Sequence, residues 1–391
     1  MKTNITLEKA MERATGRLRR KMEYSISLLR KAERIAQSYD KENGFYLAFS
    51  GGKDSQALFH ITELAGVKFQ AHMSLTSVDP PDVIRFVKRN YPEVELIAPK
   101  KSIYAVAVEK QILPTMRVRW CCNEYKEGAG AGKVTLIGIR HEESSRRKAR
   151  KEVEISSKKF SGTLEGLDVY RAEQKKKTHS KETNITNAEE ESTAGCIHGK
   201  ESLLISPIIH WTERDVWEFL NDVMQVVHCN LYDEGYRRIG CIGCPMANLK
   251  QKQRENQRWP HVKRNWIKAI IAIRTGGGIR KNSYQKNIWN PSGTALVKNG
   301  HPSTAGKSDA GYILHPDPSH WGGARKQRIM EGFSECSSSD GLTDEQEREI
   351  AENIYDWWIS GMSYKKWYAK KFLQYQFNFS DKEYEKEQPF L

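Results

Sequence analysis

The stretch that decides the fold is residues 45–55, which read FYLAFSGGKDS. Its first five residues are apolar, which is typical of a short strand buried on both faces of a sheet. The segment 50–55 that follows is polar and glycine-rich, and it runs into a stretch with helical spacing of apolar residues at Ala57, Leu58, Ile61 and Leu64. The order predicted is therefore strand, glycine-rich loop, helix.

The same alternation continues along the chain. Further short apolar runs predict strands at 67–75, 94–98, 134–139 and 203–208, and helical patterns fall between the first of them at 82–90 and 103–111. Strands that alternate with helices are typical of a parallel sheet with helices on both faces. We expect an α/β fold with a doubly wound, mostly parallel sheet and helical additions at the N- and C-terminal sides.

Composition suggests three segments. Residues 1–40 predict a helical N-terminal segment, and 41–250 an α/β domain with a polar, charged insertion at 145–200. Residues 251–391 predict a mainly helical, basic C-terminal region, in which a capping-box pattern begins a helix at Thr343. Another helix is predicted to begin after Thr212.

The 391 residues include 63 Lys and Arg against 49 Asp and Glu, which leaves a net charge of +14. That charge favours an anionic partner such as a nucleotide, a sulfate ester or a nucleic acid. Neither a run of about 18 apolar residues nor an apolar signal segment occurs, so we expect a cytoplasmic protein without a membrane partner. Six of the seven cysteines lie between residues 121 and 244, a clustering that favours metal or redox chemistry over a disulfide scaffold.

The loop at residues 50–55 has the chemistry of an anion site. Its two glycines let the backbone approach a ligand, and successive N–H groups at a helix N-terminus attract phosphate. Lys53 supplies a positive charge, and the hydroxyls of Ser50 and Ser55 can donate hydrogen bonds. The spacing differs from that of a Walker A loop. A glycine-rich turn with an incidental lysine is the alternative.

The segment SGGKDS resembles the PP-loop of N-type ATP pyrophosphatases and, among them, of the phosphoadenosine phosphosulfate (PAPS) reductase family. Three further segments resemble motifs of that family, and the resemblance covers about residues 40–250 outside the insertion. They are GIRHEESSRR at 138–147, RWCC followed by a lysine at 119–126, and YDEGYRRIGCIGCP at 232–245. The implied fold is that of the adenine nucleotide alpha hydrolases.

The resemblance implies a nucleotide site at the carboxyl ends of the strands, where open α/β sheets bind ligands. The residues expected to bind an adenine nucleotide are Ser50, Gly51, Gly52, Lys53, Asp54, Ser55, Asp79, Gly138, Arg140, Glu143, Ser144 and Arg147. Of these, Lys53, Asp54 and Arg140 are expected to be catalytic, and Mg²⁺ is expected to accompany ATP. The alternative for 138–147 is a charged surface turn, and Asp79, like Thr76, can simply end its strand.

The cysteines predict a metal centre. Cys241 and Cys244 form a C-x-x-C pair, which suits redox chemistry, zinc or iron–sulfur. Together with Cys121 and Cys122, they resemble the ligands of the [4Fe–4S] cluster of iron–sulfur adenylylsulfate (APS) reductases. DNA-phosphorothioation sulfurtransferases of the same superfamily are similar in carrying such a cluster. Zinc and the absence of any metal are the alternatives, and Cys229 is a possible substitute ligand.

Three functions follow. The first is an ATP-using enzyme that forms AMP and pyrophosphate and assists sulfur transfer, with DNA or RNA among its acceptors and a partner protein in a sulfur-transfer system. The second is a PAPS or APS reductase that releases sulfite. It would need Cys196 or Cys336 as nucleophile, because Glu335-Cys336 is followed by SSSDG and not by the Gly-Leu-His of the reductase tail. The third is a nucleotide-binding regulatory subunit without turnover.

Cations and tryptophans alternate after residue 250. Arg254, Arg258 and Lys263 lie among Trp259 and Trp266, a mixture that suits contact with a nucleic-acid strand. The same spacing fits an amphipathic helix that uses both tryptophans as core, and we favour this second interpretation.

Overall fold

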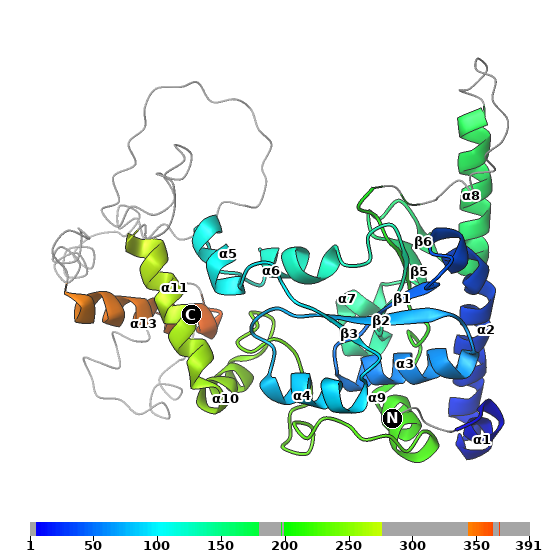
Figure 1. Cartoon of the computed structure of the whole chain (residues 1–391), viewed down its shortest axis with the longest axis horizontal. Helices are drawn as coiled ribbons and strands as arrows, with labels where there is room; N and C mark the ends of the chain where they lie inside the picture. The colour runs from blue at the N-terminus through cyan, green and yellow to red at the C-terminus, as the bar shows by residue number, and fades with distance from the viewer. Residues whose placement is uncertain (1–4, 180–196, 198, 276–342, 363–366, 368–391) are drawn as a thin grey trace, which may run out of the picture. The chain divides into compact units, whose positions relative to one another are not determined.

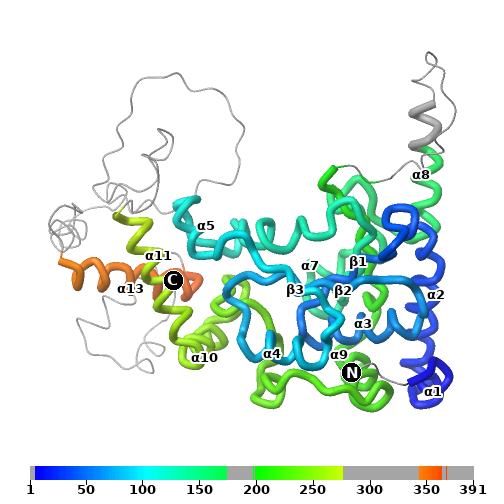
Figure 2. Tube along the Cα trace, viewed as in Figure 1, coloured from blue at the N-terminus to red at the C-terminus, as the bar shows by residue number. Residues whose placement is uncertain are grey.

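The structure is a computed structural model of the chain. It describes residues 5–179, 197, 199–275, 343–362 and 367, and Figures 1 and 2 draw the remaining residues in grey. The chain divides into two compact units. The first contains residues 1–100 and 120–241, and the second contains 101–119 and 242–391. The division into three segments that composition suggested stays a prediction.

The first unit is built on a mostly parallel sheet, as the sequence predicted (Figure 1). Within the described residues the sheet has seven strands in the order β3-β2-β1-β4-β7-β5-β6. The first five in that order are parallel, and β5 and β6 are antiparallel to their neighbours. The strands are β1 Phe45–Ala48, β2 Phe69–Ser74, β3 Glu95–Ile97, β4 Val134–Leu136, β5 Val153–Ile155, β6 Ser161–Gly162 and β7 Leu203–Ile205.

Strand β1 lies at the point where the strand order reverses. It pairs with β2 on one side and with β4 on the other, with Leu47 opposite both Ala71 and Leu136. Phe45 and Leu47 are fully buried, which explains the unbroken apolar run. Loops that leave neighbouring strands in opposite directions open a crevice at their carboxyl ends, and open α/β sheets bind ligands there.

Helices surround this sheet. Helix α2 packs against α3, β1 and β4. Its apolar positions recur at helical spacing and are all buried: Leu18, Met22, Ile26, Leu29 and Ile35. Thr15 accepts a hydrogen bond at the start of α2 and separates it from α1. The helices are α1 Leu7–Arg13, α2 Gly16–Tyr39, α3 Lys53–Ala65, α4 Pro81–Asn90, α6 Trp120–Cys122, α7 Ser145–Lys148, α8 Leu164–His179 and α9 Glu213–Glu218.

Shorter helical turns complete the unit. They are a 3₁₀ turn at His141–Glu143 and π-helical turns at Asn123–Glu127 and Phe219–Val223. The predicted cap of α9 is confirmed, because Thr212 and Asp215 form a capping box. The polar insertion contributes β5, β6 and α8, so part of it belongs to the sheet.

The second unit consists of helices in its described part. They are α5 Ile103–Lys110, α10 Leu249–Arg258, α11 Pro260–Thr275 and α13 Asp344–Ser360. Helix α11 packs against α5 and α13, and both Trp259 and Trp266 are buried. Trp266 contacts Tyr104 and Trp358. The core interpretation of these tryptophans is therefore confirmed, and the capping box at Thr343 is present.

Among the described residues, no helix has both the length and the apolar character needed to cross a membrane.

Gly51 allows a close contact that the fold needs. Its φ is +71°, and a Cβ atom there would lie 2.6 Å from Val83 and 2.9 Å from Val87. Gly51→Ala should therefore lower the free energy of unfolding by about 2–5 kcal/mol, from backbone strain plus overpacking against α4. Urea unfolding measures this change.

Gly66→Ala is the matched control. Gly66 has a φ of +69°, but nothing lies within 4 Å of its Cβ position. It should lose only about 1 kcal/mol, for the left-handed backbone. Equal losses in the two variants would contradict the contact with Val83 and Val87, and recovery in Gly51→Ala/Val83→Ala would support it.

Candidate functional site

The loop between β1 and α3 is closed by its own side chains. The Ser55 hydroxyl donates to the Gly52 carbonyl oxygen at 2.8 Å and accepts from the Ser50 backbone N–H at 3.2 Å. The two serine hydroxyls are also 3.2 Å apart. These bonds hold the backbone of residues 50–55 as a tight cradle at the start of α3.

The N-terminus of α3 receives an acceptor from far along the chain. Gly52 provides no side-chain cap, and the backbone N–H of Lys53 donates to the Tyr232 hydroxyl at 2.8 Å. Burial raises the pKa of Tyr232 by more than this hydrogen bond lowers it, so the phenol stays protonated. A neutral oxygen thus occupies the position where a helix N-terminus would attract an anion.

The Lys53 side chain turns inward and is 3% exposed. Its Nζ lies 3.5 Å from the Asp54 carboxylate, 3.6 Å from that of Glu213 and 3.4 Å from the Arg237 carbonyl oxygen. A buried ammonium requires such partners, because desolvation of a charge is costly.

Arg140 anchors the loop from behind. It lies just beyond the end of β4, is 3% exposed, and its Nε donates to Asp54 Oδ1 at 2.7 Å. Its Nη1 lies 3.1 Å from Glu142. Burial alone would lower the pKa of Arg140, but the Asp54, Glu143 and Glu142 carboxylates together raise it above its usual value, so the guanidinium stays charged. Gly138 allows this approach, since a Cβ there would lie 2.9 Å from the Asp54 carbonyl oxygen.

Glu143 lies between two cations. Its carboxylate pairs with Arg147 and lies 3.3 Å from the Arg238 guanidinium, while its side chain is 6% exposed. Its Oε1 also accepts from the Arg140 backbone N–H at 2.9 Å. The neighbouring Ser144 caps the short helix α7. Glu143 therefore compensates two cations that an anionic ligand could contact.

These elements enclose a cavity of about 150 Å³. The predicted residues that line it are Ser50, Gly52, Lys53, Asp54, Ser55, Gly138, Glu143 and Arg147. The remaining predicted residues, Gly51, Asp79, Arg140 and Ser144, are not among its lining residues. The residues that sequence reasoning missed are Ala48, Ile139, Tyr232, Arg238 and Ile239. Tyr232 and Arg238 lie in the segment 232–245, which resembles a motif of the family. That resemblance was the signal in the sequence that could have identified them.

Asp79 belongs to a neighbouring cluster instead. Its carboxylate accepts from the Thr76 backbone N–H at 2.5 Å. The Thr76 hydroxyl lies 3.4 Å from the sulfur of Cys241, and Lys126 Nζ lies 3.4 Å from the same sulfur. Burial lowers the pKa of Lys126, but nearby groups, Cys241 and Asp79 first among them, together raise it by more. Cys122 acts in the same direction. Lys126 therefore contacts the sulfur of Cys241 and is influenced electrostatically by Cys122 of the other predicted pair.

The fit to a metal centre is partial. Cys122 and Cys241 both raise the pKa of Lys126, which favours a shared site, yet the described residues contain no group of three or more His, Cys, Asp or Glu that could hold a metal ion. Cys229 is fully buried, with its sulfur 3.7 Å from Asn230. Cys244 belongs to the second unit, where burial lowers the pKa of Lys252 and Cys244 opposes that shift. Cys196 and Cys336 lie outside the described residues.

The part of the C-x-x-C segment that belongs to the second unit, residues 242–244, has its own support there. The Gly243 backbone N–H donates to the Glu255 carboxylate at 2.7 Å, and Gly243 has a φ of +68°. Glu255 is 3% exposed, and burial raises its pKa by more than this bond lowers it. The turn is thus fixed by a buried side chain of α10.

Several known proteins are similar to this chain. An uncharacterised protein of Methanocaldococcus jannaschii is 24% identical over 68% of the chain and 56% of its own length. The adenosine 5'-phosphosulfate reductase of Lysinibacillus sphaericus is 24% identical over 46% of the chain and 62% of its own length. The chain thus spans about half to three fifths of the length of these curated relatives.

Two solved structures are also similar. The FMN adenylyltransferase of Candida glabrata is 14% identical, with a TM-score of 0.37 over 61% of this chain and 68% of that one. The U34-tRNA thiolase NcsA of Methanococcus maripaludis, solved with its [4Fe–4S] cluster, is 13% identical, with a TM-score of 0.28 over 64% and 78%.

The family model described as the phosphoadenosine phosphosulfate reductase domain matches residues 44–247, which is just over half of the chain and includes the loop, the β4 end and the cysteine segments. The chain therefore belongs to the phosphoadenosine phosphosulfate reductase domain family.

Proposed function

We propose that the chain binds ATP with Mg²⁺ at residues 50–55, transfers AMP to an acceptor and assists the subsequent transfer of sulfur. An acceptor oxygen attacks the α-phosphorus, and the bond to the bridging oxygen breaks to release pyrophosphate. A sulfur nucleophile then displaces AMP from the activated acceptor. Mg²⁺ would neutralise charge on the phosphates. DNA and RNA are candidate acceptors, and a partner protein is a candidate sulfur donor.

The observation that carries this proposal is the position of Lys53 at the start of α3. A buried lysine, two serine hydroxyls and a helix N-terminus face one small cavity. That combination suits the phosphates of a nucleotide. Arg147 and Arg238 both pair with the carboxylate of Glu143. Incoming phosphates would replace that carboxylate as the partner of the two cations.

Arg140 and Asp54 serve in this proposal chiefly to position the loop. Arg140 is buried and holds Asp54, the residue that follows Lys53. Their ion pair ties the first turn of α3 to the end of β4, and so fixes the lysine against the cavity. Asp79 is proposed to contact the adenosine, from the end of β2.

An iron–sulfur cluster is part of the proposal, with no step of the reaction assigned to it. The proposed ligands are Cys121, Cys122, Cys241 and Cys244, with Cys229 as a substitute. Support comes from the order of the cysteine pairs, and from Lys126, which lies 3.4 Å from the Cys241 sulfur and whose pKa Cys122 also raises. Thiolate ligands of this kind hold [4Fe–4S] clusters in other proteins.

A reductase that releases sulfite from PAPS or APS is the second candidate. It is favoured by the curated relatives named adenosine 5'-phosphosulfate reductase. The sequence after Cys336, SSSDG, speaks against it. A regulatory subunit that binds nucleotide without turnover would keep the same cavity.

Calorimetry on anaerobically purified protein distinguishes the nucleotides. We expect ATP with Mg²⁺ to bind more tightly than PAPS or APS, and Lys53→Ala to weaken ATP binding at least 10-fold, because the phosphate charge loses its buried partner. Lys88→Ala is the control, since Lys88 is exposed on α4.

Tighter binding of a sulfated nucleotide, with sulfite released, would replace the proposal by the reductase. ATP binding without pyrophosphate release, with or without candidate acceptors, would leave the regulatory subunit.

Tyr232→Phe tests the competition at the start of α3. The variant removes the hydroxyl that now accepts from Lys53 and leaves that amide for a phosphate oxygen. We expect inorganic pyrophosphate to bind about 5-fold more tightly, which corresponds to one net hydrogen bond of about 1 kcal/mol. Tyr91→Phe, which removes a buried phenol bonded to Gln56, should leave that affinity unchanged. Weaker binding in Tyr232→Phe would mean that the hydroxyl donates to the ligand.

Iron and acid-labile sulfide analysis tests the cluster. Protein purified without oxygen should contain about four iron atoms per chain. Cys241→Ser should lose most of them, whereas Cys229→Ser should keep them. Loss of iron in Cys229→Ser alone would reassign the ligand, and zinc in place of iron would reject the cluster.

A further inference from the structure

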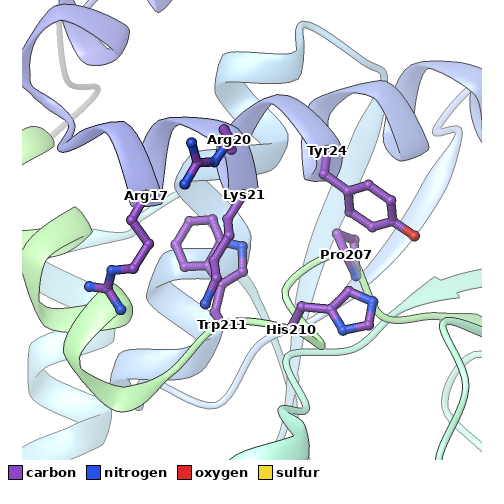
Figure 3. A pocket seen from close by; sticks show the side chains of 7 residues that line it. All are labelled: Arg17, Arg20, Lys21, Tyr24, Pro207, His210 and Trp211. Atoms are coloured by element: carbon purple, nitrogen blue, oxygen red, sulfur yellow. The ribbon is translucent and has the colours of Figure 1, made fainter.

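A second cavity lies on the first unit, away from the lining residues of the PP-loop cavity. It has a volume of about 290 Å³ and is bounded by α2 on one side and by residues 207–211 on the other (Figure 3). The residues that line it are Arg17, Arg20, Lys21, Tyr24, Pro207, His210 and Trp211. We call this cavity the α2 groove.

One stripe of α2 supplies its basic side. Residues 17, 20, 21 and 24 follow the i, i+3, i+4, i+7 spacing of a single helix face and extend over roughly 10 Å. Figure 3 shows the three cationic side chains of this stripe beside Trp211, and Tyr24 beside His210. A linear row of cations next to rings is suited to an extended anionic ligand more than to a single small anion.

Two carboxylates of α9, of which Asp215 is buried, pair with Arg17 and Lys21. Asp215, whose side chain is fully buried, lies 2.8 Å from the Arg17 guanidinium and 2.6 Å from Lys21 Nζ. Glu218 lies 3.5 Å from Arg17. These ion pairs orient the side chains of Arg17 and Lys21. They also neutralise part of the positive charge that the two residues bring to the groove.

Arg20 is different. Within the described part of the chain it makes no hydrogen bond or ion pair, and it is exposed. It therefore brings a full positive charge to the groove, ready to bind a phosphate oxygen. Arginine suits this contact because its planar fork of donors matches phosphate.

The other end of the stripe presents rings. Tyr24 is 44% exposed, and its ring meets that of His210 edge to face at 5.6 Å. The Tyr24 hydroxyl is engaged by Glu152, so the ring face is the part left for a ligand. The Trp211 side chain is 2% exposed, and its N–H donates to Ser25, which makes it the floor of the groove.

Residues 211–213 connect the α2 groove with the PP-loop, because they contact residues of both. The Trp211 carbonyl oxygen lies 3.5 Å from Arg140 Nη1, and Arg140 also holds Asp54. Two residues after Trp211, Glu213 reaches Lys53. A ligand in the groove would thus lie on the segment that also contacts the PP-loop.

We propose that the α2 groove binds a single-stranded nucleic acid, with Arg20 on the phosphate backbone and the Tyr24 and His210 rings on the bases. Cations that follow a backbone and exposed rings that stack on bases are the two components of such sites. As the surface for an acceptor strand it rests on the function proposed above, but binding itself does not depend on that function.

The test is fluorescence anisotropy with 20-nucleotide single strands of DNA and of RNA, on the full-length protein. Arg20→Ala should weaken binding about 5-fold or more and reduce the slope of log affinity against log salt by about 0.7, the value for one phosphate contact in a single strand. Arg19→Ala is the matched control. Arg19 is the adjacent exposed arginine of α2, does not line the groove and carries the same charge.

The rings are tested separately. Tyr24→Ala and His210→Ala should each weaken binding about 5-fold to 100-fold, the range for a lost base–ring stack. Tyr24→Phe, which keeps the ring, should bind normally. Heparin, a polyanion without bases, should respond to Arg20→Ala and not to His210→Ala.

Equal losses in Arg19→Ala and Arg20→Ala would overturn the proposal, because they would indicate a general effect of charge. Absence of strand binding in the wild type, or tighter binding of an acidic peptide than of either strand, would also overturn it. Lys53→Ala separates the two proposals. This variant should lose nucleotide binding and retain strand binding. A loss of nucleotide binding alone therefore does not contradict strand binding in the α2 groove.

Discussion

The ion pair between Arg140 and Asp54 is the interaction on which the candidate site depends. Arg140 is buried at the end of β4, and its guanidinium meets the carboxylate of the residue next to Lys53 at 2.7 Å. A charge in that position must be paired, because the interior solvates it poorly. The pair therefore fixes the start of α3 to the neighbouring strand, and with it the direction of the lysine.

Close packing of backbone completes this arrangement. Gly51 lets the loop pass against α4, and Gly138 lets β4 end against the Asp54 carbonyl oxygen. Strand β1, between β2 and β4, places both loops at one edge of the sheet. The cavity is thus a consequence of strand order and of two positions that exclude a side chain.

One segment of chain contacts residues of both cavities described above. Residues 211–215 give the α2 groove its floor through Trp211, reach Lys53 through Glu213, and hold Arg17 and Lys21 through Asp215. The capping box of Thr212 and Asp215 fixes the start of α9 within this segment. A ligand in the α2 groove would therefore contact a segment that also contacts residues of the PP-loop cavity.

The sequence by itself determined the local elements and the family. The apolar run 45–49, the glycine-rich loop and the alternation of strands with helices predicted a parallel sheet, because buried parallel strands carry unbroken apolar runs. Thr212 and Thr343 marked helix starts, since a capping side chain acts on its own first turn.

Tertiary structure decided what depends on contacts between distant residues. It placed Tyr232 at the start of α3, buried Arg140 behind the loop, and put Asp79 beside Thr76 and Lys126 outside the lining of the cavity. It also gave the basic stripe of α2 a facing wall at 207–211. Spacing along a chain predicts which residues share a face, but the partner of that face is set by packing across the whole sheet.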